Sequence, residues 1–208
     1  MKTLLLIRHA QSHANAGGAP MPDRELPLSD TGRRQAAELP DRLPEGRRVF
    51  VSRMRRTGET AAPYCARHGI GPAVLPCLDE FSYLPFGLIA RLRPAERRVL
   101  AQDYWQRGDV RERAGQETDS FADFDARVEA FLQRWHEWPD GSLMFGHGIW
   151  IALLAWKLLG FQAVSSADMA AFRAFQTALP MPNAAVWTLS GRRREDLRLT
   201  FRSAPEAA

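Results

Sequence analysis

The feature that most constrains the fold is a set of short apolar runs that end abruptly in polar residues. Residues 3–7 form the first run, and Arg8 and His9 end it. A strand that is buried on both faces has this pattern, which is the usual state of strands in a parallel sheet. Further runs lie at residues 47–51, 70–75 and 142–145. The chain is therefore predicted to build a sheet with several buried parallel strands.

Helical segments lie between these runs. Ser29 or Asp30 is expected to cap a helix that ends near Leu43, and Ser52 to cap one that ends near Gly69. Further helices are expected over residues 94–105, 120–138, 148–159 and 165–175. Strands that alternate with helices predict an α/β fold, a three-layer α/β/α sandwich with a mainly parallel sheet.

The end of the chain has a different pattern. Residues 185–189 and 197–201 alternate between apolar and polar, and the loop between them predicts an antiparallel hairpin at one edge of the sheet. We expect one domain over residues 1–203, with a small cap-like segment at about 81–118 and a disordered tail over 204–208.

Composition excludes several classes of protein. The chain has 208 residues, of which 45% are hydrophobic and 25% are charged, as in ordinary globular proteins. Arg8 and His9 end the first apolar run too early for a signal peptide, and no apolar stretch is long enough to cross a bilayer. We therefore expect a cytoplasmic protein without a membrane partner. Cys65 and Cys77 form no CxxC pair, so we expect free thiols and neither a metal nor a cofactor.

Arginine dominates the positive charge. The chain contains 28 Lys and Arg residues, and Lys2 and Lys157 are the two lysines. The excess fits either an anionic ligand, which the guanidinium fork binds well, or an arginine-rich genome. Residues 192–194 are all arginine, but Glu195 and Asp196 follow and no aromatic residue interleaves. We expect a solvated turn there and no nucleic-acid partner.

Basic and imidazole side chains follow three of the predicted strands. They are Arg8 and His9, then Arg56 after the second strand, then His147 within Gly146–Gly148. Ligands of open α/β sheets bind at the carboxyl ends of strands, so these side chains are expected to converge. Guanidinium forks orient phosphoryl oxygens and an imidazole can attack phosphorus, so this set suits a phosphoryl group.

The ordered motifs resemble those of the histidine phosphatase superfamily, also called phosphoglycerate-mutase-like. The matching segments are Leu6–Ser12 with Asn15, Leu28–Gly32, Ser52–Ala61, Leu78–Glu80, Ser120 with Arg127, Gly146–Gly148 and Asn183. The resemblance implies that His9 is the nucleophile and Glu80 the general acid and base. It also implies that the phosphoryl group is held by Arg8, Arg56 and His147, with Ser12 and Asn15 completing the substrate-binding set.

Departures from the family pattern leave alternatives open. Ala10 stands where many members have Gly, which matters if that position has a positive φ. The Gly and the second Glu that often follow Glu80 are absent, which makes Asp79 an alternative acid. His9 and His13 have the spacing of a zinc-binding pair, but a strand precedes them and Gln11 is no general base.

Three functions fit these residues. The first is a phosphomonoester hydrolase that acts on a small-molecule phosphate ester. The second is a cofactor-dependent phosphoglycerate mutase, and the third is a non-catalytic phosphate-binding regulatory module. The aromatic residues of the cap-like segment either line a pocket for the leaving group or form core: Phe81, Tyr83, Phe86, Tyr104 and Trp105. Exposed aromatic side chains on the helix over residues 120–138 would favour a homodimer.

Overall fold

The structure, a computed structural model, describes residues 1–203 and is built around a six-stranded sheet. The strands are β1 (Lys2–Arg8), β2 (Val49–Val51), β3 (Ala73–Val74), β4 (Ser142–Gly146), β5 (Val186–Gly191) and β6 (Arg198–Ser203). Their order is β3-β2-β4-β1-β5-β6, in which the first four are parallel and β5 and β6 form an antiparallel hairpin at one edge. The predicted α/β fold and its edge hairpin are confirmed.

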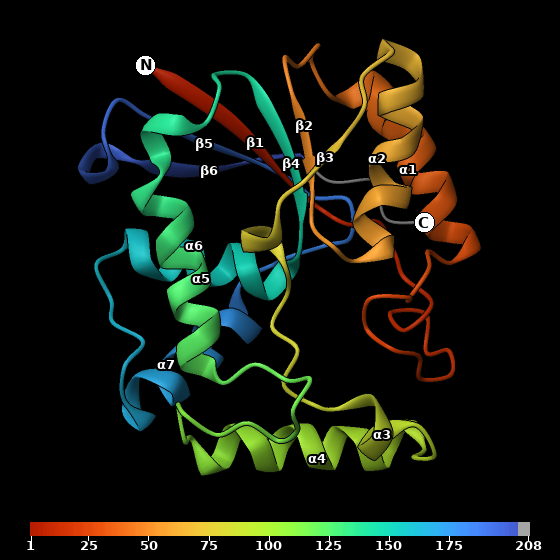
Figure 1. The fold of residues 1–208 in the computed structure, drawn as a ribbon, viewed down its shortest axis with the longest axis vertical. Coiled ribbons are helices and arrows are strands. Elements are labelled where there is room, and N and C mark those ends of the chain that lie inside the picture. The colour runs from red at the N-terminus through yellow and green to blue at the C-terminus, as the bar shows by residue number, and fades with distance from the viewer. Residues whose placement is uncertain (204–208) are drawn as a thin grey trace.

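Helices cover both faces of the sheet (Figure 1). One face carries α1 (Asp30–Arg42) and α2 (Arg55–His68), and the other carries α5 (Phe121–Gln133) and α6 (Gly148–Leu158). The helices α3 (Phe86–Ile89) and α4 (Pro94–Arg107) lie beyond the end of the sheet, within the segment predicted as a cap, and α7 (Ser166–Ala178) lies near α4.

Strand β1 shows why the three layers form. All its side chains from Leu4 to Ile7 are buried. Leu4 and Leu6 join the apolar cluster beneath α5 and α6, while Leu5 and Ile7 join the cluster beneath α1 and α2. Successive side chains of a strand point to opposite faces, so one uninterrupted apolar run supplies both cores.

Three local predictions need correction. The strand predicted over 70–75 is only Ala73–Val74, because Pro72 has no N–H to donate to the ladder and Gly71 weakens a strand. Ser52 does not cap α2, whose N-cap is Met54. The helix predicted over 120–138 ends at Gln133, and a short 3-10 turn over Trp135–Glu137 follows.

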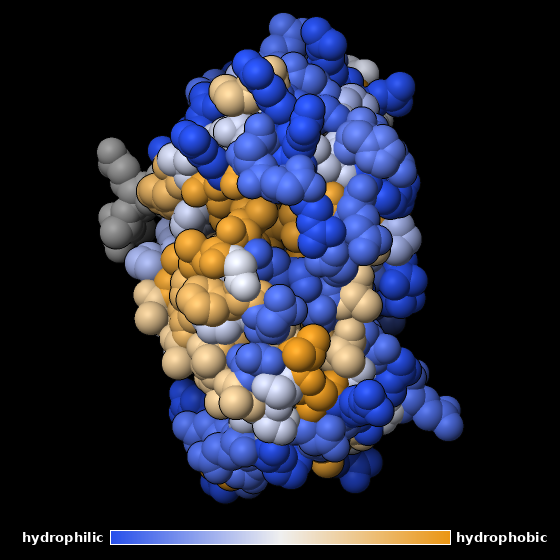
Figure 2. Space-filling model, turned by 90° about the vertical axis from the view of Figure 1, so that its left-hand side faces the viewer, coloured by the Kyte–Doolittle hydropathy of each residue, from blue (hydrophilic) through white to orange (hydrophobic). Residues whose placement is uncertain are grey.

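The aromatic side chains of α5 and the following turn are not exposed, contrary to the prediction. The five lie at 5% exposure or less and pack in the core: Phe121, Phe124, Phe131, Trp135 and Trp138. Apolar surface lies instead on the side of the molecule seen in Figure 2, and exposed hydrophobic residues such as Leu159, Phe161 and Val164 follow α6. α5 therefore presents no exposed aromatic face that would favour a homodimer.

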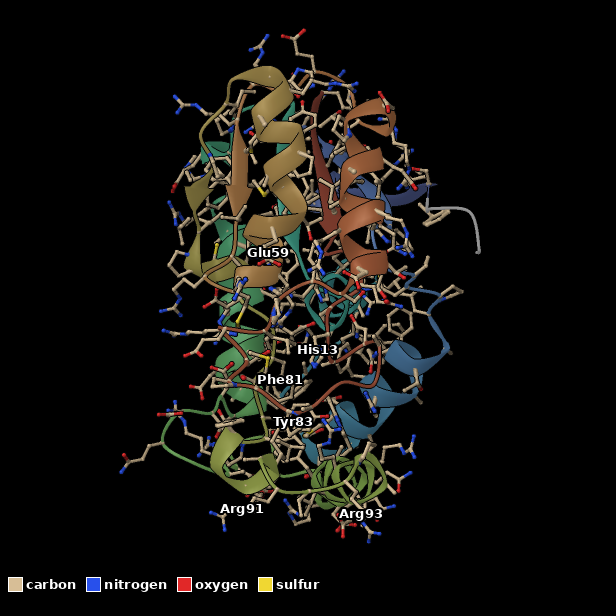
Figure 3. All side chains as sticks on the ribbon, turned by 90° about the vertical axis from the view of Figure 1, so that its right-hand side faces the viewer. His13, Glu59, Phe81, Tyr83, Arg91 and Arg93 are labelled. Atoms are coloured by element: carbon tan, nitrogen blue, oxygen red, sulfur yellow. The ribbon has the colours of Figure 1, made fainter. Side chains whose placement is uncertain are left out.

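The structure divides the aromatic residues of the cap-like segment between core and pocket. Tyr104 and Trp105 of α4 are buried in the main core, whereas Tyr83 and Phe86 line a pocket. Phe81 does both, since it lines the pocket and stacks on Phe124 with 4.9 Å between ring centroids. Figure 3 shows Phe81 and Tyr83 between the sheet and the α3–α4 region.

Two further observations concern the chain as a whole. No helix within residues 1–203 is long and apolar enough to cross a membrane. The predicted disordered tail, residues 204–208, lies outside the described residues.

Candidate active site

His9 follows β1 directly and is held on both sides of its peptide. Its N–H donates to the carbonyl oxygen of Gly146 at 2.9 Å, and its own carbonyl accepts from Asn183 Nδ2 at 3.2 Å. The ring nitrogen Nδ1 lies 2.7 Å from the carbonyl oxygen of Ala10. A carbonyl only accepts, so Nδ1 carries the ring proton and Nε2 keeps a free lone pair.

His147 lies beside His9, at the point where β4 passes into α6. The two ring centroids are 5.2 Å apart, and His147 is fully buried. Its Nε2 lies 2.8 Å from Ser52 Oγ. Its Nδ1 is buried and has no hydrogen-bond partner among residues 1–203.

Two arginines border the same cleft. Arg8 donates from Nη1 to the carbonyl oxygen of Met181, while its buried Nε has no partner within the described part of the chain. Arg56, at the start of α2, has a side chain only 5% exposed. It donates from Nη1 to the carbonyl oxygen of Asp23 at 2.7 Å and to Asp23 Oδ1 at 2.8 Å. Both guanidinium groups are therefore fixed by protein oxygens.

Glu80 reaches the cleft and Asp79 does not. The Glu80 carboxylate accepts the backbone N–H groups of Ile149 and Trp150, each at 3.0 Å, and so caps the first turn of α6. Asp79 turns to Arg53 instead, and accepts from its backbone nitrogen at 2.8 Å and its Nε at 2.6 Å. Of the two carboxylates predicted as alternatives for the acid, the structure places Glu80 at the cleft and Asp79 away from it.

The cleft has a volume of about 500 Å³, and the side chains from three strand ends meet in it. Of the predicted residues it is lined by Arg8, His9, Ser12, Asn15, Arg56 and Glu80, whereas His147 does not line it and lies behind His9. Ser12 and Asn15 are joined to each other through Ser12 Oγ and Asn15 Oδ1 at 3.0 Å. A second pocket of about 600 Å³ adjoins the cleft, and Asp23 and Glu80 line both.

Burial and charge determine how the site titrates. Desolvation, followed by the positive charges of Arg56 and Arg8, holds the pKa of His9 well below its ordinary value. Desolvation and Arg56 lower the pKa of His147 in the same way. Burial raises the pKa of Glu80 despite the backbone N–H groups that favour its charged form. A neutral His9, two guanidinium groups and a carboxyl group that keeps its proton to higher pH therefore line one cleft, with a neutral His147 against His9.

Several residues of the site were not predicted. Asp23 holds Arg56 from a loop without regular pattern, and Ser52 contacts His147 where the sequence predicts a helix cap. Arg173 of α7 also lines the cleft. Ser52 could have been found from its position four residues before Arg56, at the end of the same strand. Nothing in the sequence links residues 23 and 173 to the site.

The departures from the family pattern do not disturb the backbone of the site. Ala184 is the one non-glycine residue with positive φ in the described range, so Ala10 has an ordinary backbone conformation. In the same range no three His, Cys, Asp or Glu side chains cluster as metal ligands would, and His13 lies against Gly18 of its own loop.

Known proteins resemble this chain in sequence and in fold. The chain is 28% identical over 167 residues to a probable phosphoglycerate mutase of Yersinia enterocolitica, with 77% of this chain and 76% of the relative covered. It matches the whole length of a mycobacterial glucosyl-3-phosphoglycerate phosphatase, solved in complex with VO3, with a TM-score of 0.70 and 25% identity. A phosphoserine phosphatase of Entamoeba histolytica shares the fold, with a TM-score of 0.72, 18% identity and 98% of each chain covered.

The family itself is shown by a match over nearly the whole chain. The sequence model of the histidine phosphatase superfamily (branch 1) matches residues 4–190, which include all three strand ends at the cleft. The chain therefore belongs to the histidine phosphatase superfamily, branch 1.

Proposed function

We propose that the protein hydrolyses small-molecule phosphomonoesters through a phosphohistidine formed on His9. Two orphaned polar atoms carry the proposal. Arg8 lines the cleft and the His147 ring packs on His9, and Arg8 Nε and His147 Nδ1 are buried without partners in residues 1–203. A buried polar atom without a partner costs free energy, and phosphoryl oxygens would accept from both. Superfamily membership and the phosphatases of the same fold support this proposal.

In the first step, His9 Nε2 attacks phosphorus and the bond from phosphorus to the ester oxygen breaks. Arg8 and Arg56 neutralise the charge that spreads over the phosphoryl oxygens. Glu80 gives its proton to the leaving oxygen, which becomes an alcohol. The raised pKa of Glu80 keeps that proton available at higher pH than for an ordinary carboxyl group.

In the second step, the Glu80 carboxylate takes a proton from water while the water oxygen attacks phosphorus. The bond between phosphorus and His9 Nε2 breaks, inorganic phosphate leaves, and Glu80 is protonated again. The lowered pKa of His9 keeps its imidazole neutral, and therefore nucleophilic, below the pH at which an ordinary histidine becomes protonated.

The test is turnover of a panel of phosphate esters together with phosphoenzyme trapping. We expect an acid-labile phosphohistidine in the wild type, and a loss of turnover of at least about 1,000-fold in His9→Ala. His13→Ala, a histidine four residues away outside the cleft lining, is the matched control. Full turnover by His9→Ala would refute the mechanism, and tight ester binding without turnover by the wild type would indicate a phosphate-binding module.

A mutase remains the second candidate because the Yersinia relative carries that name. A mutase returns the phosphoryl group to the same sugar acid and must keep water from the phosphohistidine. Incubation with 3-phosphoglycerate and a bisphosphate primer separates the two functions. Formation of 2-phosphoglycerate faster than inorganic phosphate would favour the mutase, and release of phosphate alone supports hydrolysis.

A further inference from the structure

We infer that α7 provides a second anion-binding subsite, centred on Arg173, which accepts a carboxylate or a second phosphate on the leaving group. Arg173, Gln176 and Thr177 lie on one face of α7 and line the same cleft as Arg8 and His9. The inference rests on the proposed function and narrows its substrates to phosphomonoesters that carry a second negative group.

The guanidinium group of Arg173 is held in place by two neighbours. Its central carbon lies 4.8 Å from the centroid of the Trp105 ring, and its Nη1 donates to Gln176 Oε1. Trp105 is buried in the core, so the ring is a rigid support. A stacked guanidinium still directs its N–H groups outward in its own plane, where an anion can accept from two of them.

Arg173 has no acidic partner among residues 1–203, in contrast to Arg56 in the same cleft. Arg53, Arg55 and Arg127 each form an ion pair with a carboxylate, and Arg56 in the same cleft pairs with Asp23. Over residues 1–203, no Asp or Glu oxygen forms an ion pair with Arg173. Its charge is therefore available to a bound anion.

The segment that follows α7 contacts Arg8 directly. Leu179 and Met181 follow α7 and also line the cleft, and the Met181 carbonyl accepts from Arg8. A phosphoryl group held at the strand ends by Arg8 and Arg56 fills only part of about 500 Å³. The remaining space on the α7 side suits the leaving group, and Arg173 is the cation that borders it.

The test compares two esters that differ in one group, 3-phosphoglycerate and glycerol 3-phosphate. We expect the wild type to prefer the carboxylate through a lower KM, by about tenfold in kcat/KM, the effect of one charge-assisted contact. Arg173→Gln should abolish most of this preference by raising KM for 3-phosphoglycerate alone, and Arg173→Lys should retain part of it.

Arg134→Gln is the matched control. Arg134 also stacks on a tryptophan, with its central carbon 4.8 Å from the Trp138 ring, and also bonds a residue three positions on, Glu137. It does not line the cleft. We expect the preference for 3-phosphoglycerate to be unchanged in this variant.

Binding gives a readout that does not depend on turnover. Both esters are titrated into His9→Ala by calorimetry, with and without Arg173→Gln. An equal loss for both esters, or a wild type that shows no preference in rate and in binding, overturns the subsite. Failure of the proposed function looks different, because no ester is then hydrolysed and no phosphohistidine is trapped, whatever residue occupies position 173.

Discussion

At the scale of the residue, the contact between Ser52 and His147 is the clearest case of one side chain setting the chemistry of another. The pKa of His147 is lowered, so its ring is neutral and carries a single proton. When Ser52 Oγ donates to Nε2 across 2.8 Å, that proton sits on the orphaned Nδ1. In that arrangement Nδ1 of His147 is a donor that can reach a bound oxygen.

Ser52→Ala should lower kcat/KM by about two- to tenfold, the worth of one neutral hydrogen bond, without unfolding the protein. The measurement is the pH profile of kcat/KM together with the melting temperature. If Ser52 had a purely structural role, the substitution would lower the melting temperature and leave the pH profile of kcat/KM unchanged. Ser52→Thr keeps the hydroxyl group and serves as the rescue variant.

The residues predicted from the sequence are those whose position follows from a strand end. His9, Arg56 and His147 come together because each lies just beyond a strand, whereas Glu80 was predicted from the family resemblance alone. The partners that tune them could not be predicted in this way. Asp23 and Arg173 reach the cleft from a loop and from a distant helix, so only tertiary packing brings them there.

At the scale of the element, α1 packs directly on the loop that follows His9. A Cβ atom added to Gly32 would lie 1.9 Å from the carbonyl oxygen of Gln11, which cannot retreat because it is backbone. Ser29 Oγ at the cap of the same helix bonds the Gln11 side chain at 2.6 Å. Gly32 is therefore required by close approach, since its φ is not positive.

Gly32→Ala should destabilise the protein by about 1–3 kcal/mol through overpacking and lower turnover by displacing the loop beside His9. Gly58→Ala in α2 is the control, because its new Cβ would meet no atom within 4 Å. Better helix propensity should raise stability by about 1 kcal/mol there, or about 2–4 °C in melting temperature. Thermal unfolding of both variants tests the pair, and equal shifts would contradict the packing argument.

Helices and strands were predictable from sequence where local propensity and burial agree. The predicted boundaries were wrong where tertiary contacts determine where an element begins or ends. The serine caps of α1, α5 and α7 all accept from the backbone N–H three residues on. Ser52 has the same local chemistry, yet its hydroxyl bonds Thr57, His147 and the N–H of Met54, two residues on. The aromatic residues of α5 were misplaced because a sequence does not show what covers a helix face.

At the scale of the whole molecule, the fold buries His9 and His147 and so couples their protonation to stability. His9 and His147 both have pKa values well below 6.5 in the folded protein. At acid pH the unfolded chain therefore binds protons at these residues that the folded protein does not bind. Their effect on stability is absent above pH 6.5 and grows as the pH falls below that value. The free energy of unfolding should therefore fall toward acid pH, by at most about 1.4 kcal/mol per pH unit for each histidine.

Urea unfolding between pH 5.5 and 8 measures this slope. The double variant His9→Gln/His147→Gln should lose most of it, although its stability at pH 8 changes for other reasons. Glu80 acts in the opposite direction, because its raised pKa gives the folded state the tighter hold on a proton. Since Glu80 is present in both proteins, the difference between their slopes isolates the histidines. Parallel curves for the two proteins would show that neither imidazole is held neutral by the fold, and would remove the electrostatic basis for His9 as the nucleophile.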